Sequence, residues 1–241
     1  DDIGLGFNEA TGAGGLPELL RAVNGAVKDA GGHGWVRLMY AYPSNFRDEF
    51  IDAFAELSQN GHVLPYIDIP LQHASQRMLE LMRRHVDAKQ QLELMHKLRD
   101  RVPGIAIRTT FISGFPGETQ ADHEQLLEFI EEVGFDAVGV FEYSKEPGTP
   151  AGTMEDDPKL AVPHEVKAQR KAEIMQLQQD IAFEQAEFLA SQWDEKDPLE
   201  SGVQLDILID RDTGSEVEAT TGVSVGGKLY QGRAYHQAPQ I

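Results

Sequence analysis

The sequence predicts an α/β fold, in which a parallel sheet or part of a (β/α) barrel is followed by a small, truncated antiparallel β-barrel. Two observations carry this prediction. Near-continuous apolar runs recur about every 30–40 residues through the first 145 residues, with apolar residues at helical spacing between them. Beyond residue 199, shorter runs alternate apolar with polar residues and are separated by turn-forming segments.

Four apolar runs are expected to form the strands of the parallel sheet. They are Trp35–Tyr40, Leu64–Ile69, Ile105–Ser113 and Ala137–Tyr143. A strand that is buried on both faces is apolar along its whole length, which is typical of parallel sheets covered by helices. Four βα units in one direction suit either an open α/β sheet or part of a (β/α) barrel.

The helices expected between these strands each place apolar residues on one face. Thr119 lies three residues before Asp122, which is the spacing of a capping box at a helix start. The same spacing relates Asn45 to Asp48 at the start of an earlier helix. Apolar residues at helical spacing are Phe50, Phe54 and Leu57, then Leu92, Met95, Leu98 and Val102, then Leu127, Ile130 and Val133.

The last third of the chain has a different pattern. A long helix is expected over Pro163–Trp193, because Pro suits the first helical turn and an apolar stripe follows. Alternation over Val203–Ile209 predicts a half-buried strand, and Asp212–Gly214 predicts a turn. We therefore place one domain at residues 1–195 and a second at 199–241. Further short strands are expected around Val217, Val223–Val225 and Leu229–Tyr235.

Composition excludes several classes of protein. With 41% hydrophobic residues the chain can form a core, and it has no apolar run of the roughly 20 residues that a membrane helix needs. The absence of cysteine excludes disulfides, thiolate zinc sites and any iron–sulfur cluster held by these residues. The net charge of −19 disfavours a general nucleic-acid binder and favours a basic protein partner.

Two segments at expected strand ends are the first candidates for a binding site. Ser113–Glu118 (SGFPGE) joins a strand to a helix, where glycines allow close backbone approach and a helix start offers free N–H groups. Pro70–Ser75 (PLQHAS) places Gln72 and His73 at another strand end. The alternatives are an ordinary tight turn for the first segment and loop hydrogen bonding with helix capping for the second.

Two further segments and one charge complete the candidates. Tyr40–Asn45 and Tyr143–Pro150 also follow strands, although their tyrosines suit plain packing and Lys145 suits a solvated turn. Arg108 lies inside an apolar strand, so we expect an acidic side chain or an anionic ligand beside it. The eight histidines show no HxxxH or HExxH spacing, which argues against a histidine metal site.

Taken in order, these motifs resemble the radical-SAM methylthiotransferases, and most closely the branch that modifies a ribosomal protein. The matching segments are YAYPSN, YIDIPLQHAS, RTTFISGFPGET and VGVFEYSKEPGTPA, and the ending LYQGRAYHQAPQI is similar to the family's TRAM domain. The tRNA-modifying branch typically carries PLQSGS where this chain has PLQHAS.

The resemblance implies a partial TIM-like barrel that binds S-adenosyl-L-methionine and a [4Fe–4S] cluster, followed by a TRAM β-barrel that binds the substrate. It implies radical methylthiolation at the β-carbon of an aspartate in a small-subunit (30S) ribosomal protein, in the cytoplasm and with an electron donor for the cluster. The residues it assigns to cofactor binding are Gln72, His73, Arg108, Ser113, Gly114, Phe115, Pro116, Gly117 and Glu118. Those it assigns to the barrel mouth are Tyr40, Tyr42 and Tyr143, and Asp210 and Asp212 are expected to contact the basic substrate.

The chain departs from the family in one respect, because the CxxxCxxC loop that holds the cluster is absent. We expect it to be the later part of a longer enzyme and inactive by itself. A tRNA methylthiotransferase is the first alternative, but residues 199–241 contain three basic and six acidic residues, a net charge of −3 that repels phosphate. A non-catalytic α/β module that binds a nucleoside is the second alternative.

Overall fold

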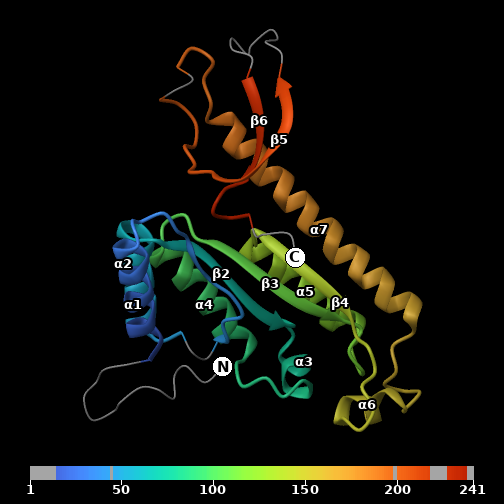
Figure 1. Ribbon diagram of the computed structural model, residues 1–241. Helices are drawn as coiled ribbons and strands as arrows, with labels where there is room; N and C mark the ends of the chain where they lie inside the picture. Colours follow the sequence, from blue (N-terminus) through green and yellow to red (C-terminus); the bar gives the residue numbers. More distant parts are fainter. Residues whose placement is uncertain (1–14, 44–45, 198–199, 218–226, 238–241) are drawn as a thin grey trace, which may run out of the picture. The chain divides into compact units, whose positions relative to one another are not determined.

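The computed structural model describes residues 15–43, 46–197, 200–217 and 227–237 (Figure 1). Two compact units divide the chain, Asp1–Glu187 and Phe188–Ile241. The domains predicted from the sequence, residues 1–195 and 199–241, remain a prediction. None of the helices in the described ranges is long and apolar enough to cross a membrane.

The first unit contains a parallel sheet of four strands in the order β1-β2-β3-β4. These strands are β1 (Val36–Leu38), β2 (Val63–Gln72), β3 (Ala106–Ser113) and β4 (Ala137–Glu142), so the four strands predicted from sequence are confirmed. Neighbours in the chain are also neighbours in the sheet, as in (β/α) barrels, and Figure 1 shows β2, β3 and β4 side by side with α4 and α5 on one face.

Helices connect the strands. The helices are α1 (Gly15–Asp29), α2 (Asp48–Asn60), α3 (Gln76–Leu81), α4 (Ala88–Arg101), α5 (Gln120–Val133), α6 (Pro150–Glu155) and α7 (His164–Ser191). Three of them, α4, α5 and α6, begin at a residue whose side chain caps the helix, whereas α2 and α3 begin without a side-chain cap. The capping box of Thr119 and Asp122 is confirmed, and α5 ends at Gly134 in the left-handed conformation. Asn45, predicted to cap α2, lies outside the described residues.

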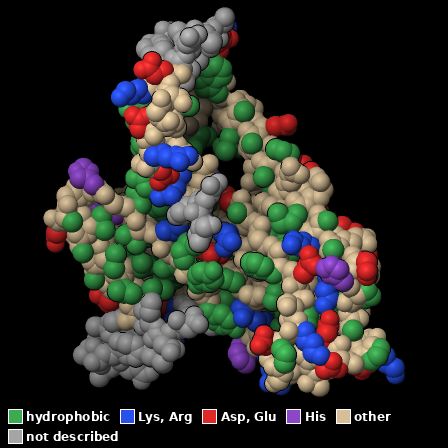
Figure 2. Space-filling view, turned by 45° about the vertical axis from the view of Figure 1, so that its right-hand side comes forward, with side chains coloured by type: hydrophobic (Ala, Val, Ile, Leu, Met, Phe, Trp, Pro, Cys, Tyr) green, Lys and Arg blue, Asp and Glu red, His purple; other side chains and the backbone are tan. Residues whose placement is uncertain are grey.

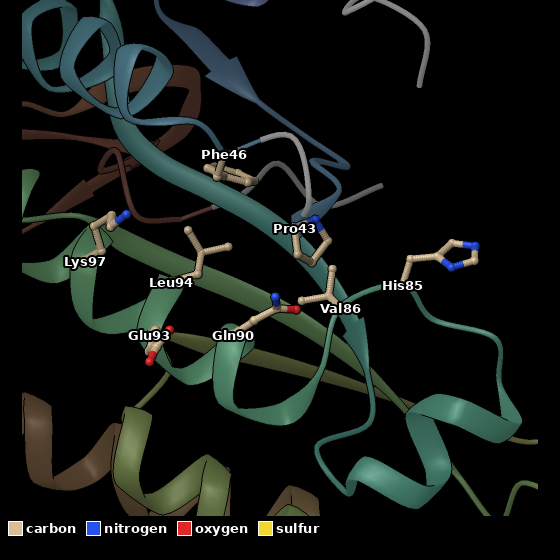
Figure 3. Close-up of a pocket in the computed structure, with 8 residues that line it drawn as sticks. All are labelled: Pro43, Phe46, His85, Val86, Gln90, Glu93, Leu94 and Lys97. Carbon is tan, nitrogen blue, oxygen red and sulfur yellow. The ribbon is translucent and has the colours of Figure 1, made fainter.

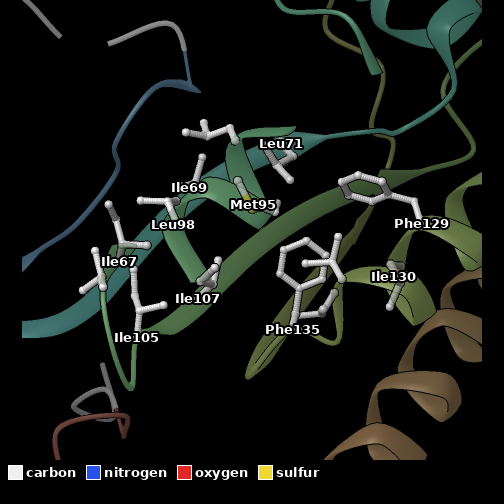
Figure 4. Packing of buried hydrophobic residues seen from close by; sticks show 14 of the residues in the cluster. Ile67, Ile69, Leu71, Met95, Leu98, Ile105, Ile107, Phe129, Ile130 and Phe135 are labelled. Carbon is white, nitrogen blue, oxygen red and sulfur yellow. The ribbon is translucent and has the colours of Figure 1, made fainter. Parts of the chain in front are cut away.

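The core fills the space between the sheet and these helices. Residues that alternate along β2 point to it, and Figure 4 shows Ile67, Ile69 and Leu71 beside Met95 and Leu98 of α4. A cluster of three rings, Phe111, Phe129 and Phe135, closes the core between β3 and α5, with ring centroids 5.9–6.5 Å apart. The residues that alternate with these core residues face away from the helices. We call this side of the sheet its inner face, and it carries polar side chains such as Asp68 and Arg108.

The second unit contains an antiparallel pair, β5 (Leu208–Val217) and β6 (Gly227–Arg233). The strand predicted over Val203–Ile209 is wrong for its first five residues, because β5 begins at Leu208, where β6 ends opposite it at Arg233. The alternating apolar side chains before β5 are exposed, with Val203 at 49% and Ile207 at 52%.

The turn predicted at Asp212–Gly214 is also wrong, because these residues lie within β5. The register shifts here, Gly214 adopts a left-handed conformation (φ 71°), and its N–H donates to Asp212 Oδ1 at 2.9 Å. The turn residues therefore form a bulge, which is the other structure that such residues favour inside a strand. The strand predicted at Val223–Val225 lies outside the described residues.

Candidate functional site

Three adjacent strands end in a left-handed residue at the same edge of the sheet. Tyr40 follows β1 (φ 57°), Gln72 ends β2 (φ 75°) and Gly114 follows β3 (φ 72°). For the two residues with a side chain this conformation is uncommon and costs about 1–2 kcal/mol. Strain of this kind gathers at functional sites, and carboxyl strand ends are where (β/α) barrels bind ligands. The edge is therefore the candidate site.

The loop after β3 is folded around its own glutamate. Glu118 Oε2 accepts the N–H groups of Gly114 at 2.7 Å and Phe115 at 3.3 Å, while the Gly117 N–H donates to Leu160 O at 2.7 Å. The N–H groups of these three loop residues are therefore already used inside the protein. What this loop can offer a ligand is its carbonyl groups and apolar surface.

The Glu118 carboxylate is buried with two basic partners. Arg170 Nη1 of α7 donates to its Oε1 at 2.8 Å, and His73 Nε2 lies 3.8 Å from Oε2. Burial would raise the pKa of Glu118, but His73, Arg170 and the Gly114 N–H together lower this pKa below its ordinary value. The ionised carboxylate of Glu118 thus holds the loop together by hydrogen bonds and connects it to α7.

The buried His73 side chain forms hydrogen bonds with the backbone that follows it and does not contact solvent. Its Nδ1 accepts the N–H groups of Ala74 at 2.9 Å and Ser75 at 3.0 Å, so the ring proton resides on Nε2, toward Glu118. The residue is fully buried. Gln72 is half-buried instead, and among the described residues its side-chain amide has no hydrogen-bond partner. Of this predicted pair, Gln72 is the residue that a ligand can reach.

Asp122 joins the loops that follow β2 and β3. It accepts Ser75 Oγ at 2.6 Å and Arg77 Nε at 3.2 Å, and its other oxygen bonds Thr119 and a second nitrogen of Arg77. Burial opposes ionisation, but these donors hold the pKa of Asp122 far below its usual range. The sequence predicted Asp122 only as a helix cap, and its contact with Ser75 joins residues 47 positions apart.

Helix α7 supports the same loop from the side. Ser113 Oγ donates to the Lys167 carbonyl at 2.9 Å, and the Lys167 side chain lies against Gly114, where a Cβ would meet its Cδ at 2.9 Å and its Cγ closer still. Lys167 Nζ pairs with Glu155 at 2.7 Å and lies 5.0 Å from the centre of the Tyr143 ring. Gly114 is therefore required by the packing of α7.

The predicted tyrosines lie at opposite edges of the four-stranded sheet. Tyr143 follows β4 and its ring packs edge-on against Phe115, with centroids 5.2 Å apart. Burial raises the pKa of Tyr143, with a further contribution from Glu155. Tyr40 follows β1 and is 73% exposed, and Tyr42 packs under the guanidinium of Arg84, 4.6 Å from the ring centre. Only Tyr143 adjoins the loop after β3.

The inner face of the sheet holds an ion pair level with the start of β4, five residues before the end of β3. Arg108 of β3 donates to Asp68 of β2 at 2.7 Å, which confirms the expected acidic partner. Asp68 is fully buried, and burial raises its pKa despite the opposing effect of Arg108. Beside it, the Arg37 guanidinium lies 4.4 Å from the ring centre of Tyr66. Asp68 and Tyr66 were not singled out from the sequence, because both lie within a run that predicted only a strand. Their spacing of two residues places both on the face of the strand opposite the core, which is the signal that could have identified them.

A separate groove of about 660 Å³ lies between the segment after β1 and helix α4 (Figure 3). None of the predicted site residues lines it. Figure 3 shows Phe46 and Pro43 facing Leu94 across it. The lining residues are Pro43, Phe46, His85, Val86, Gln90, Glu93, Leu94 and Lys97.

The acidic residues proposed for substrate contact are already paired within the hairpin. Asp210 lies 3.1 Å from Arg233, and Asp212 lies 3.9 Å from Lys228. On the face shown in Figure 2, basic and acidic side chains are interspersed. Within the described ranges no three His, Asp or Glu side chains gather as a metal site. Because the chain also has no cysteine, these residues do not fit a [4Fe–4S] cluster.

Comparisons with known proteins place these features in a family. The profile of the radical SAM superfamily matches residues 4–130. "Ribosomal protein uS12 methylthiotransferase RimO" of Lachnoclostridium phytofermentans is 38% identical over 229 residues, 94% of this chain and 44% of that protein. The protein of the same name from Cytophaga hutchinsonii is 45% identical over 169 residues, 70% of this chain and 36% of that protein. The chain thus spans about two fifths of such relatives.

A solved structure shares the fold. The coproporphyrinogen III oxidase HemN of Escherichia coli, described as a radical SAM enzyme, superposes with a TM-score of 0.54 at 14% sequence identity. The superposition covers 69% of this chain and 37% of that chain. At this identity the likeness concerns the fold alone.

Proposed function

The chain belongs to the radical SAM superfamily, and from this membership we propose that it is part of an enzyme that adds a methylthio group to ribosomal protein uS12. The observation that carries the proposal is the similarity to RimO proteins at 38% identity over 229 residues, which extends through both compact units. The site of modification is the β-carbon of an aspartate, as the motif resemblance implies. The antiparallel strand pair of the second unit is the start of a TRAM barrel that receives the basic substrate.

S-adenosyl-L-methionine binds at the carboxyl edge of β2, β3 and β4 in this proposal. When bound with a reduced cluster, this cofactor supplies a carbon radical that can remove a hydrogen atom from an unactivated C–H bond. The edge suits a nucleoside because the amide of the half-buried Gln72, unpartnered among the described residues, offers both a donor and an acceptor.

The remaining predicted residues act by holding that edge in place. His73 and Glu118 are buried and fix the loops after β2 and β3, while Gly114 admits Lys167 of α7. Ser113 and Gly117 are tied to the backbone by hydrogen bonds, and Pro116 lies between them. Preorganised loops of this kind keep a ligand oriented without reordering on binding. The cluster is held by residues other than those of this chain.

The proposal is tested with the complete enzyme that carries this chain, reconstituted anaerobically with iron, sulfide and a reductant. Equal amounts of uS12 and of unmodified tRNA are offered, and both products are analysed by mass spectrometry. We expect uS12 to gain the mass of one methylthio group on an aspartate and tRNA to stay unchanged. Modified tRNA would assign the chain to the tRNA branch, and no modification with intact cofactor binding would favour a nucleoside-binding module.

A further inference from the structure

We propose that Arg170 of helix α7 is a positioning residue of the S-adenosyl-L-methionine site and acts through Glu118 on the loop of residues 113–118. The inference rests on the proposed function, which places the cofactor at this edge of the sheet, and it names the residue that keeps the edge in shape. Its basis is the set of contacts that the first turns of α7 make with the loop, all within the first compact unit.

Helix α7 holds the loop at both of its ends. At the first end, Ser113 Oγ donates to the Lys167 carbonyl at 2.9 Å, and the Lys167 side chain lies against Gly114. At the other end, Arg170 Nη1 donates to Glu118 Oε1 at 2.8 Å and to the Glu118 carbonyl at 3.2 Å. Lys167 and Arg170 are three residues apart, which places both on one face of the helix. The loop therefore lies between two neighbouring contacts of the same helix.

The ion pair of Arg170 and Glu118 is buried, and each partner depends on the other. The side chain of Arg170 is 7% exposed and that of Glu118 is 1% exposed. Among the described residues, Glu118 is the only hydrogen-bond partner of the Arg170 side chain. A buried pair of this kind often adds no net stability compared with well-packed apolar side chains, whereas loss of one partner leaves an uncompensated charge. The pair therefore serves the geometry of the loop more than the attachment of α7.

The geometry that Arg170 fixes is that of the backbone after β3. Glu118 Oε2 accepts the N–H groups of Gly114 at 2.7 Å and Phe115 at 3.3 Å, while Oε1 faces Arg170. Without Arg170, the buried carboxylate would be left with His73, whose Nε2 lies 3.8 Å away. The carboxyl group would then take up a proton or turn toward water, and either change weakens its bonds to the two N–H groups. The shape of the loop thus depends on a residue 52 positions away in the sequence.

Other contacts attach α7 to the first unit without touching the loop. Gln178 lies about two turns further along α7 than Arg170 and is also buried, and its Nε2 donates to the Phe135 carbonyl at 3.0 Å. Lys171 Nζ lies 3.5 Å from Glu142 at the end of β4. Attachment of the helix and positioning of the loop are therefore carried by different residues, so they can be changed separately.

The test measures the affinity of the complete, reconstituted enzyme for S-adenosyl-L-methionine by calorimetry without reductant, together with hydrogen exchange of the loop. Arg170→Gln should weaken binding by about ten- to a hundredfold, as expected if the ordered loop falls to about a tenth or a hundredth of the molecules. In the absence of the cofactor, the loop of residues 113–118 should exchange faster in this variant than in the native enzyme. Arg170→Lys keeps a positive charge beside Glu118 and should recover part of the affinity.

Two controls on the same helix separate positioning of the loop from attachment of α7. Gln178→Ala leaves the Phe135 carbonyl without its donor, so it should lower the free energy of unfolding. Its affinity for the cofactor should stay within about twofold of the native value. Lys171→Gln removes a half-exposed charge from the residue next to Arg170 and should match the native enzyme in both measurements.

A double-variant cycle tests whether Arg170 acts through Glu118. Glu118→Gln removes the buried charge and keeps an oxygen for the loop N–H groups, so in this background the loss of Arg170 leaves no uncompensated carboxylate. Arg170→Gln should therefore change the cofactor affinity much less in this background than in the native one. The same comparison guards against reading simple unfolding of the single variant as a loss of positioning.

Three results would overturn the assignment. One is native affinity and native loop exchange in Arg170→Gln. Another is an equal loss of affinity in Gln178→Ala, which would make Arg170 only a residue that attaches α7. The third is additive effects in the double-variant cycle, which would show that Arg170 acts independently of Glu118. Native enzyme that does not bind the cofactor would instead overturn the proposed function, a result distinct from these three.

Discussion

Gly114→Ala should destabilise the first unit more than the same change at other left-handed glycines of the chain. The new methyl group would lie 2.9 Å from Lys167 Cδ and 3.0 Å from its Cβ, so the lysine must move away from Glu155. The left-handed backbone costs about 1–2 kcal/mol for alanine. Disrupting a largely buried ion pair adds up to about 3 kcal/mol. We expect a total loss of up to about 5 kcal/mol in the free energy of unfolding.

Gly117→Ala is the matched control within the same loop. Gly117 is also left-handed (φ 87°), but a Cβ there would meet Leu160 at 3.6 Å, an ordinary contact. Its expected cost is therefore the backbone term alone, about 1–2 kcal/mol. Urea unfolding followed by Trp35 fluorescence, in a Trp193→Phe background, reports on the first unit. Equal losses for Gly114→Ala and Gly117→Ala would refute the packing of Lys167 described above.

Three further predictions concern the core and two buried carboxylates. Phe135→Ala should lower the free energy of unfolding by about 3–5 kcal/mol, whereas the 64% exposed Phe141→Ala should change it by less than about 0.5 kcal/mol in the same urea assay. The pKa of Asp122 is lowered in the folded state, so the ionised carboxylate stabilises the fold fully above pH 3.8 and less as pH falls below it. Asp122→Asn should therefore reduce the loss of unfolding free energy between pH 3.8 and lower pH. The pKa of Asp68 is raised instead, so its ionisation opposes folding as pH rises above 3.8. Asp68→Asn should therefore gain stability relative to the native protein as pH rises above 3.8, measured by urea unfolding of both proteins at each pH.

Apolar periodicity predicted the sheet because each strand is covered by helices on its core face. The run at Leu64–Ile69 lies within β2 and stops three residues before its end, and the run at Ile105–Ser113 begins one residue before β3 and ends with it. The same signal failed over Val203–Ile209, since alternation predicts a strand only where a partner strand exists to pair with it. Local pattern carries no information about that partner.

The candidate site was predicted in place but not in detail. Strand-end position and motif pointed to Gln72 and to the loop of residues 113–118, and the fold brings both to one edge of the sheet. What the sequence could not show is that Glu118 takes up the loop's own N–H groups or that Lys167 packs on Gly114. These contacts join residues that are close only after folding. The direction of the Glu118 side chain determines whether the loop N–H groups bind Glu118 or stay free for a ligand.

The most direct test of the central claim is the intact mass of uS12 in cells. Ribosomes are purified from the organism that carries this gene, from a strain in which the gene is deleted, and from that strain complemented with the native gene. The account predicts a methylthio group on uS12 in the native and complemented strains, and its loss in the deletion strain. Fully modified uS12 in the deletion strain would contradict the assignment of this chain to uS12 methylthiolation.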